Sequence, residues 1–191
     1  MKKLIFLDID GVLNNYSFHG KWMSERKKEN PDISQTELAL QFKRCFLEAT
    51  EYEFFNGYIV PENLDNFNRI IDATNADVVL SSDWRFINDG NYNNVADIDV
   101  IKQLFKVRGI KGNVLGSTPL VSIRGDRAIE ILRYIRANNL NDTRIVVIDD
   151  LREAGEALRD VPDSMFIWTD YKTGLTKEEA EEVIEFLNKG E

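Results

Sequence analysis

The sequence predicts an α/β protein built on a doubly wound, Rossmann-like parallel sheet. Short apolar runs that end in polar residues occur at 3–7, 77–82, 144–150 and 165–170, the pattern of buried parallel strands. Helical patterns lie between these runs, and such alternation is typical of βαβ units. Because ligands of these folds bind beyond the carboxyl ends of the strands, we expect the polar strand ends to converge on one site.

Three of the helical patterns begin with a recognisable start signal. Pro61 opens ENLDNFNRIIDAT, and Asp126 stands before RAIEILRYI. Thr176 and Glu179 have the spacing of a capping box before AEEVIEFL. These signals place helices directly after the loops that leave the predicted strands.

Residues 14–59 separate the first strand from the next helix by far more than a usual βα loop. The second half of this segment, SQTELALQFKRCFLEAT, predicts a helix with a capping box at Ser34 to Glu37. Its apolar stripe consists of Leu38, Phe42, Cys45 and Ala49, with Cys45 as a small core residue. We interpret 14–59 as a small helical cap inserted into a single domain of residues 1–191.

Composition and charge exclude several classes of protein. Lys and Arg number 24 against 33 Asp and Glu, so a net charge of −9 argues against a broad nucleic-acid-binding surface. A single cysteine rules out a disulfide framework within the chain. The apolar stretch between Lys3 and Asp8 is too short for a signal peptide or a membrane span. We therefore expect a cytoplasmic protein with no membrane partner.

Asp8 and Asp10 follow the first apolar run in LIFLDIDGVL. Residues two apart at a strand end point to the same side, and two carboxylates there cost free energy unless a divalent cation neutralises them. Gly11 allows the sharp turn that follows. The alternative is a capped turn without catalytic function. The similar run at 97–99 lacks both the apolar residues and the glycine, and it lies in the helical pattern ADIDVIKQLF.

Four segments resemble, in order, the four motifs of the haloacid dehalogenase-like (HAD) superfamily: LIFLDIDGVL, VVLSSDWR, RAIEI and IVVIDD. The resemblance runs essentially from end to end. More narrowly, SSDWR, RAIEI and the late GLTKEEA are similar to HAD domains found in, or related to, bacterial Swiss Army knife RNA repair proteins. The resemblance implies a HAD-type phosphatase that uses Mg²⁺ and an aspartyl-phosphate intermediate.

The resemblance also implies catalytic and phosphate-binding residues. Asp8 would be the nucleophile, and Asp10 would protonate the leaving oxygen and then activate the hydrolytic water. Ser81 would hydrogen-bond the transferring phosphoryl group, with Ser82 as the fallback. The simpler alternative is that the two serines cap the turn at Asp83.

Basic residues near these motifs are candidates for neutralising the phosphate. Arg85 is either a phosphate or substrate clamp or a surface salt-bridge partner, whereas the neighbouring Trp84 is interpreted as a packing residue. For the third motif we favour Arg127, with Arg124 as its rival, and each could equally face solvent. The sequence alone does not choose between them.

Asp149 and Asp150 close the strand of the fourth motif. Adjacent strand residues point in opposite directions, so one of them should reach a metal while the other supports the loop. The resemblance favours Asp150 as the direct ligand and Asp149 as its support. Together with Asp8 and the backbone carbonyl of Asp10, this would form an oxygen site for Mg²⁺.

Two features of the insertion receive no catalytic assignment. His19 is interpreted as a loop residue, and KWMSERKKEN as a solvated basic cluster that would become a contact if the substrate is a nucleic-acid end.

The sequence thus predicts a Mg²⁺-dependent phosphomonoester hydrolase acting on a phosphorylated small molecule or a nucleic-acid end. The alternatives are a polynucleotide or nucleotide 3′-phosphatase of nucleic-acid repair, and a non-catalytic HAD-fold binding protein. Dehalogenation is disfavoured, because Asp10 is needed by phosphatases and not by dehalogenases.

Overall fold

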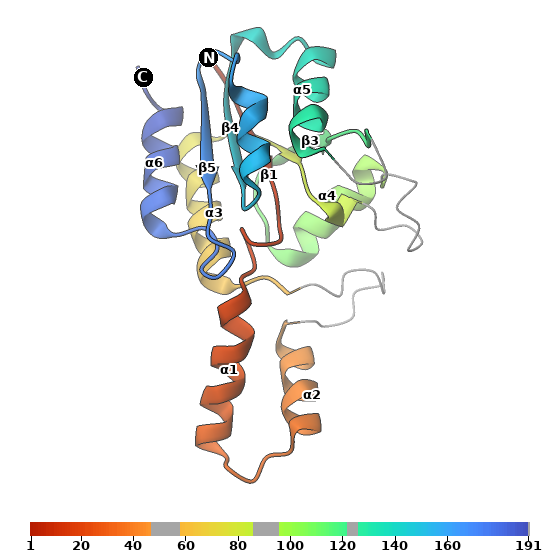
Figure 1. The fold of residues 1–191 in the computed structure, drawn as a ribbon, viewed down its shortest axis with the longest axis vertical. Coiled ribbons are helices and arrows are strands. Elements are labelled where there is room, and N and C mark those ends of the chain that lie inside the picture. Colours follow the sequence, from red (N-terminus) through yellow and green to blue (C-terminus); the bar gives the residue numbers. More distant parts are fainter. Residues whose placement is uncertain (47–57, 86–95, 122–125, 191) are drawn as a thin grey trace.

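The structure, a computed structural model, describes residues 1–46, 58–85, 96–121 and 126–190. Its centre is a five-stranded parallel sheet with the strand order β3-β2-β1-β4-β5 (Figure 1). The strands are β1 Lys2–Leu7, β2 Asp77–Leu80, β3 Asn113–Ser117, β4 Thr143–Asp149 and β5 Ser164–Trp168. The predicted fold class is confirmed, and the four predicted apolar runs coincide with β1, β2, β4 and β5.

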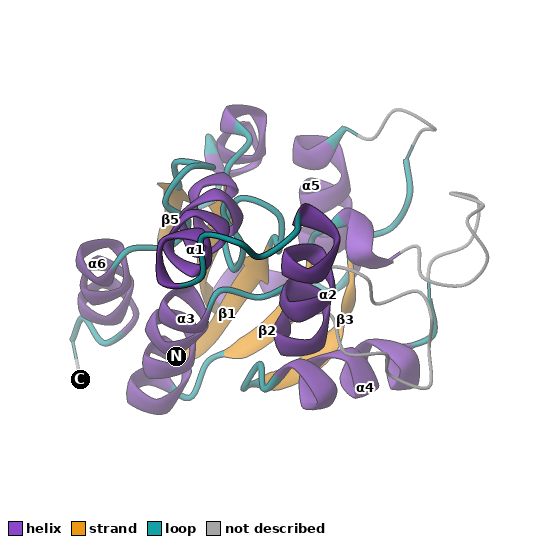
Figure 2. Cartoon of the chain, turned by 90° about the horizontal axis from the view of Figure 1, so that it is seen from below, coloured by secondary structure: helices purple, strands orange, loops and turns teal. Residues whose placement is uncertain are grey.

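Helices cover both faces of the sheet (Figure 2). One core cluster joins the sheet to α3 Pro61–Thr74, α4 Ile98–Arg108 and α6 Lys177–Leu187. A second cluster joins the other face to α5 Arg127–Ala137 and the 3-10 helix η3 Arg152–Leu158. Two shorter 3-10 helices, η1 Asp83–Arg85 and η2 Leu140–Asp142, lie in the connections. The sheet is therefore doubly wound, with its strands buried on both sides.

The register of the central strand positions the predicted motifs at one level. Leu7 of β1 pairs with Leu80 of β2 on one side and with Ile148 of β4 on the other. Asp8, Ser81 and Asp149 follow these three residues directly. They therefore emerge together at the carboxyl edge of the sheet, as expected for a parallel fold.

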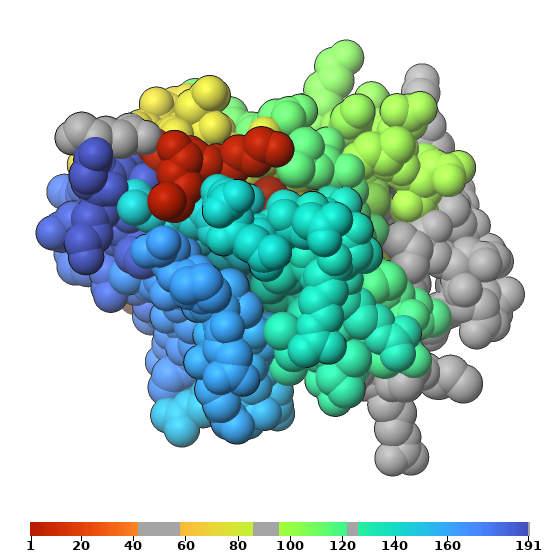
Figure 3. Space-filling model, turned by 90° about the horizontal axis from the view of Figure 1, so that it is seen from above, coloured from red at the N-terminus to blue at the C-terminus, as the bar shows by residue number. Residues whose placement is uncertain are grey.

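The other end of the sheet, where the strands begin, is shown in the space-filling view of Figure 3. The start of the chain, in red, lies there between yellow residues near the β2 end and cyan residues near β4. This arrangement agrees with the pairing of β1 to both strands. No helix within the described ranges is long and apolar enough to cross a membrane.

The edge strand β3 was not predicted from the sequence. Its sequence NVLGS contains one buried apolar residue, Val114, and its Leu115 is 46% exposed. The pairing between β2 and β3 also shifts in register between Val78 and Val79. A short, half-exposed strand that includes Gly116 gives neither a continuous apolar run nor a clear alternation.

The predicted helix starts are confirmed. Pro61 occupies the first turn of α3, where its missing N–H costs nothing. The Asp126 carboxylate accepts a hydrogen bond from the N–H of Ile129 at the start of α5. Thr176 and Glu179 form the expected capping box at the start of α6.

The described part of the inserted segment folds into α1 Tyr16–Glu29 and α2 Gln35–Phe46, which extend past the carboxyl ends of the strands (Figure 1). Of the capping box predicted at Ser34 to Glu37, the structure has the hydrogen bond from the N–H of Glu37 to the Ser34 hydroxyl at 3.1 Å, and Leu38 is buried. The Phe42 and Cys45 side chains and Ala49 lie outside the described residues.

Helix α1 was not predicted, because it buries none of its residues and so shows no apolar stripe. Asn15 caps it by accepting a hydrogen bond from the N–H of Phe18. His19 therefore lies on an exposed helix rather than in a loop. The segment enters and leaves the domain at adjacent points, since the N–H of Val60 donates to the carbonyl of Leu13 at 2.8 Å.

Candidate active site

Three carboxylates meet at the carboxyl edge of the sheet. Asp8, Asp149 and Asp150 each offer an oxygen, and these oxygens lie within 4.8 Å of one another. Asp8 and Asp149 are buried, with 3% and 0% of their surface exposed, and Asp150 is half-buried. Clustered carboxylate oxygens of this kind are the ligands that Mg²⁺ prefers, so the residues fit that ion.

Burial makes two of these carboxyl groups hard to ionise together. It raises the pKa of Asp8 from 3.8 to about 6, while the neighbouring Arg127 and hydrogen bonds from Ser82 and the N–H of Ile9 act in the opposite direction. Burial, followed by the charge of Asp8, raises the pKa of Asp149 to about 8. A bound cation would favour the charged forms of both groups.

Asp149 and Asp150 differ from the expectation that only one of them reaches the cluster. Oδ1 of Asp149 accepts a hydrogen bond from the N–H of Leu151 at 2.8 Å, which supports the loop as predicted. Its Oδ2 has no hydrogen-bond partner among the described residues and lies 3.5 Å from Nη1 of Arg127, while one oxygen of Asp149 belongs to the cluster. Both carboxylates reach the same point because β4 ends at Asp149 and the chain bends at Asp150. The choice of Asp150 as direct ligand stays a prediction.

Arg127 is the first residue of α5, and this position places its side chain beside the carboxylates. Its Nη1 lies 3.6 Å from Asp8 Oδ1 and 3.5 Å from Asp149 Oδ2, and 10% of its side chain is exposed. The structure therefore places this arginine at the site rather than in solvent. Its predicted rival, Arg124, lies outside the described residues.

The two serines at the end of β2 have different surroundings. The Ser81 hydroxyl is buried and has no hydrogen-bond partner in the described parts of the chain. The Ser82 hydroxyl accepts a hydrogen bond from the N–H of Trp84 at 3.4 Å and also contacts Asp8. Ser82 thus caps the turn at Trp84 and also contacts Asp8. The Ser81 hydroxyl makes no hydrogen bond to the described residues.

Asp10 is exposed, unlike Asp8, and two neutral groups hold its carboxylate. The amide of Asn14 donates to Oδ1 at 2.7 Å, and the indole nitrogen of Trp84 donates to Oδ2 at 3.0 Å. Trp84 also packs against the core, so its interpretation as a packing residue was incomplete. Sequence reasoning missed both donors, although Trp84 follows closely on the serines at the end of β2.

Gly11 is required by the geometry of the turn between Asp10 and Asn14. Its φ of +72° lies in the left-handed region, and a Cβ atom there would collide with the Asp150 carboxylate. Its N–H donates to Asn14 Oδ1 at 2.9 Å, and its carbonyl accepts from Thr169 Oγ1 at 2.9 Å. The turn therefore packs directly against the carboxylate cluster.

Arg85 is buried rather than part of a surface salt bridge, so that interpretation is wrong. Its Nη2 contacts Glu130 Oε2 at 2.7 Å, and its Nη1 donates to Thr118 Oγ1 at 2.5 Å. Only 1% of the arginine and 0% of the glutamate are exposed. These contacts engage both terminal nitrogens inside the protein, and the structure gives no support to the alternative role as a phosphate clamp.

Comparison with known protein families gives a match over most of the chain. The family described as the HAD domain in Swiss Army Knife RNA repair proteins matches residues 4–180. No curated protein matches the chain. Among solved structures, a haloacid dehalogenase-like family hydrolase from Streptococcus pneumoniae is similar over 96% of this chain and 90% of that chain, with a TM-score of 0.43 and 11% sequence identity.

The family match includes the carboxylate cluster, both serines and Arg127. The chain therefore belongs to the family of HAD domains in Swiss Army knife RNA repair proteins, within the haloacid dehalogenase-like superfamily.

Proposed function

We propose that the protein is a Mg²⁺-dependent phosphomonoester hydrolase that works through an aspartyl-phosphate intermediate. The observation that carries the proposal is the buried cluster of Asp8, Asp149 and Asp150, which has Arg127 within 3.6 Å of Asp8. Membership of a HAD family supports the same conclusion. Phosphoryl transfer needs such a concentration of positioning groups and compensating charge.

In the first step, an Asp8 oxygen forms a bond to phosphorus while the bond from phosphorus to the ester oxygen breaks. Asp10 gives a proton to the departing oxygen, and the alcohol leaves. In the second step, Asp10 takes a proton from a water molecule, whose oxygen bonds to phosphorus while the bond from phosphorus to the Asp8 oxygen breaks, and phosphate leaves. Asp8 is then a free carboxylate again, so the cycle closes.

The residues around Asp8 divide the remaining tasks. Asp8, Asp150, Asp149 and the backbone carbonyl of Asp10 would hold Mg²⁺, which supplies positive charge to the phosphate oxygens. Arg127 would neutralise the phosphate from the α5 side, and the Ser81 hydroxyl would donate a hydrogen bond to it. The unpaired state of the Ser81 hydroxyl among the described residues supports this assignment.

The test is phosphate release from p-nitrophenyl phosphate, mononucleotides and 3′-phosphorylated oligonucleotides, with Mg²⁺ or EDTA. We expect activity that needs Mg²⁺ and disappears in Asp8→Asn. Asp99→Asn is the matched control, because Asp99 is an exposed carboxylate at the start of α4. Unchanged activity in Asp8→Asn would reject the nucleophile. Inactivity of the wild type on all these esters would favour a non-catalytic binding protein.

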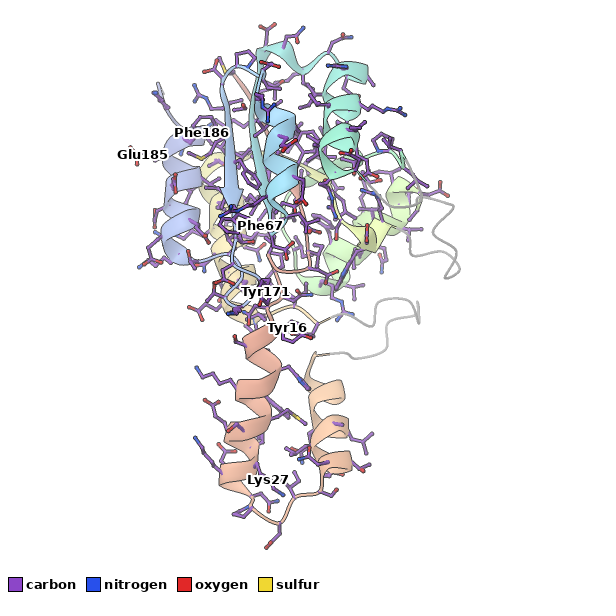
Figure 4. The ribbon with its side chains drawn as sticks, in the orientation of Figure 1. Tyr16, Lys27, Phe67, Tyr171, Glu185 and Phe186 are labelled. Carbon is purple, nitrogen blue, oxygen red and sulfur yellow. The ribbon has the colours of Figure 1, made fainter. Side chains whose placement is uncertain are left out.

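A second candidate, hydrolysis of a polynucleotide or nucleotide 3′-phosphate, is favoured by two exposed aromatic rings beside the site. Tyr16 is 81% exposed and Tyr171 is 50% exposed, and their rings meet edge to face with centroids 6.2 Å apart. Both lie where α1 joins the domain (Figure 4). Burial and then the charges of Asp10 and Tyr16 raise the pKa of Tyr58, which indicates that these groups are neighbours.

Exposed aromatic side chains are platforms on which nucleobases stack. If the leaving group carries a base, Tyr16→Ala and Tyr171→Ala should lower kcat/KM for a 3′-phosphorylated oligonucleotide and leave that for p-nitrophenyl phosphate nearly unchanged. Stacking predicts a loss of about 1–3 kcal/mol per base. Leu115→Ala, an exposed apolar residue on β3, is the control. Equal losses on both substrates would count against base recognition.

A further inference from the structure

We propose that the buried pair of Arg85 and Glu130 is a positioning device that holds Arg127 against Asp8. The inference rests on the proposed phosphatase function and assigns a role to a pair that does not touch the substrate. Arg85 belongs to η1, which directly follows the two serines after β2, and Glu130 lies one turn after Arg127 on α5. The pair therefore joins the end of a central strand to the helix that carries Arg127.

Arg85 connects three elements that meet at the carboxyl edge of the sheet. Its guanidinium contacts Glu130 on α5 at 2.7 Å and Thr118 after β3 at 2.5 Å. Its own N–H donates to the carbonyl of Ser82 at 3.1 Å, and the N–H of Thr118 donates to the carbonyl of Leu80 at 3.0 Å. These contacts hold the start of α5 at a fixed position relative to the end of β2.

Arg127 depends on such an anchor because, in the described parts of the chain, no hydrogen bond holds its Nη1 in place. Its Nη1 lies 3.5 Å and 3.6 Å from the carboxylates of Asp149 and Asp8. It has no hydrogen-bond partner among the described residues. The place of the guanidinium is therefore set by where α5 begins, and a shift of the first turn would move it relative to Asp8.

Stability alone does not explain a buried ion pair at this position. Removing two charges from water is costly, and well-packed apolar residues of similar volume often serve as well or better. Glu130 also leaves Oε1 without a hydrogen-bond partner in the described parts of the protein. A pair with directional contacts is instead suited to fixing the orientation of a helix at the active site.

The experiment is a double-mutant cycle between Glu130→Gln and Arg127→Ala, read as steady-state phosphate release in Mg²⁺. We expect Glu130→Gln to lower kcat about 10- to 100-fold in the wild-type background, the scale expected for a misplaced catalytic group. In the Arg127→Ala background it should have little further effect on kcat. If Glu130→Gln does not fold, Arg85→Lys replaces it in the cycle. Lysine keeps the charge but cannot contact Glu130 and Thr118 with two separate nitrogens.

Ile135→Val is the matched control, because Ile135 is buried on the same helix and packs in the second core cluster. It should lower the melting temperature while kcat is retained. A fall of kcat in Ile135→Val equal to that in Glu130→Gln would overturn the proposal. So would an equal fall from Glu130→Gln with and without Arg127.

A wild type that hydrolyses no ester would refute the proposed function without deciding the position of Arg127. That position is then read from crystal structures of the wild type and Glu130→Gln. An unchanged separation between Arg127 and Asp8 would overturn the inference, and a displaced Arg127 would support it.

Discussion

The indole nitrogen of Trp84 donates a hydrogen bond to Oδ2 of Asp10 over 3.0 Å, while Asn14 occupies Oδ1 at 2.7 Å. Asp10 is exposed, and a carboxylate in solvent is free to rotate unless its neighbours hold it. These two donors therefore fix the direction in which the proposed acid and base presents its oxygens.

Trp84→Phe tests this relationship, since it keeps an aromatic ring and removes the donor. The proposed acid matters most when the leaving oxygen is basic. We expect kcat to fall about tenfold for an alkyl phosphate and much less for p-nitrophenyl phosphate, whose leaving group needs little protonation. Trp22→Phe, on α1, is the control. Equal losses for both esters would show that Trp84 acts through packing alone.

Gly11→Ala should damage the carboxylate cluster without unfolding the sheet. The residue has a φ of +72°, and its new Cβ would collide with Asp150. We expect weaker Mg²⁺ binding by calorimetry and a loss of activity of about 100-fold, as for a catalytic group displaced by about 1 Å.

Gly20→Ala is the matched control for that substitution. Gly20 lies within α1, and a Cβ there meets no atom within 4 Å. It should raise the free energy of unfolding by about 0.5–1 kcal/mol and leave Mg²⁺ binding unchanged. If Gly11→Ala behaved in the same way, the close approach of Gly11 to Asp150 would not constrain the site.

The stability of the metal-free protein should fall as the pH rises. Folding raises the pKa of Asp8 from 3.8 to about 6 and that of Asp149 to about 8, mainly through burial. The folded state therefore binds protons more tightly than the unfolded state. The stability that this provides is complete below pH 3.8 and is lost as the pH rises through 6 and 8.

Thermal unfolding in EDTA between pH 5 and 8.5 measures this effect. Asp149→Asn should flatten the pH dependence, whereas Asp99→Asn should not. Mg²⁺ should restore stability most strongly at the alkaline end, because it binds the charged carboxylates. A melting temperature that rises with pH in EDTA would contradict the prediction.

Asn63 should contribute to stability through the loop after β5. Its side-chain amide is buried and donates to the carbonyls of Thr173 and Leu175 at 2.9 Å each, and its oxygen accepts from Asn15. Asn63→Ala removes these three buried hydrogen bonds, although Asn15 still donates to the Thr173 carbonyl and Asn66 to the Leu175 carbonyl. We expect a loss of about 1–3 kcal/mol in the free energy of unfolding.

Urea unfolding checks this value, with Asn68→Ala as the control. Asn68 lies on the same helix and makes two comparable hydrogen bonds, but in exposed surroundings. Its replacement should cost less than that of Asn63. Equal costs would indicate that burial of the Asn63 network is unimportant.

The sequence predicted the central strands because each is a continuous apolar run that ends in polar residues. It also predicted that Asp8 would meet the pair Asp149 and Asp150, since the ends of parallel strands share one edge. Arg127 was favoured through the family resemblance alone, with Arg124 as its rival. Sequence reasoning failed where a contact joins distant parts of the chain. The burial of Arg85 depends on Glu130, 45 residues away, and the contact of Trp84 with Asp10 spans 74 residues.

One helix of the inserted segment, α1, was missed for a different reason. Helix α1 buries no residue, so the periodicity that identifies other helices is absent. The cap of Asn15 on Phe18 is a local signal that was present in the sequence, but an asparagine alone is common in turns.

The hydrogen bond between Leu13 and Val60 closes the base of the inserted segment. Within the segment, Asn14 and Asn15 are tied to the domain through Asp10 and Asn63. Helices α1 and α2 lie beyond these contacts, so their sequences can change while the strand and helix on either side keep their places. Evolution, or a protein engineer, can therefore exchange these two helices and leave the carboxylates and the side chains that hold them in place.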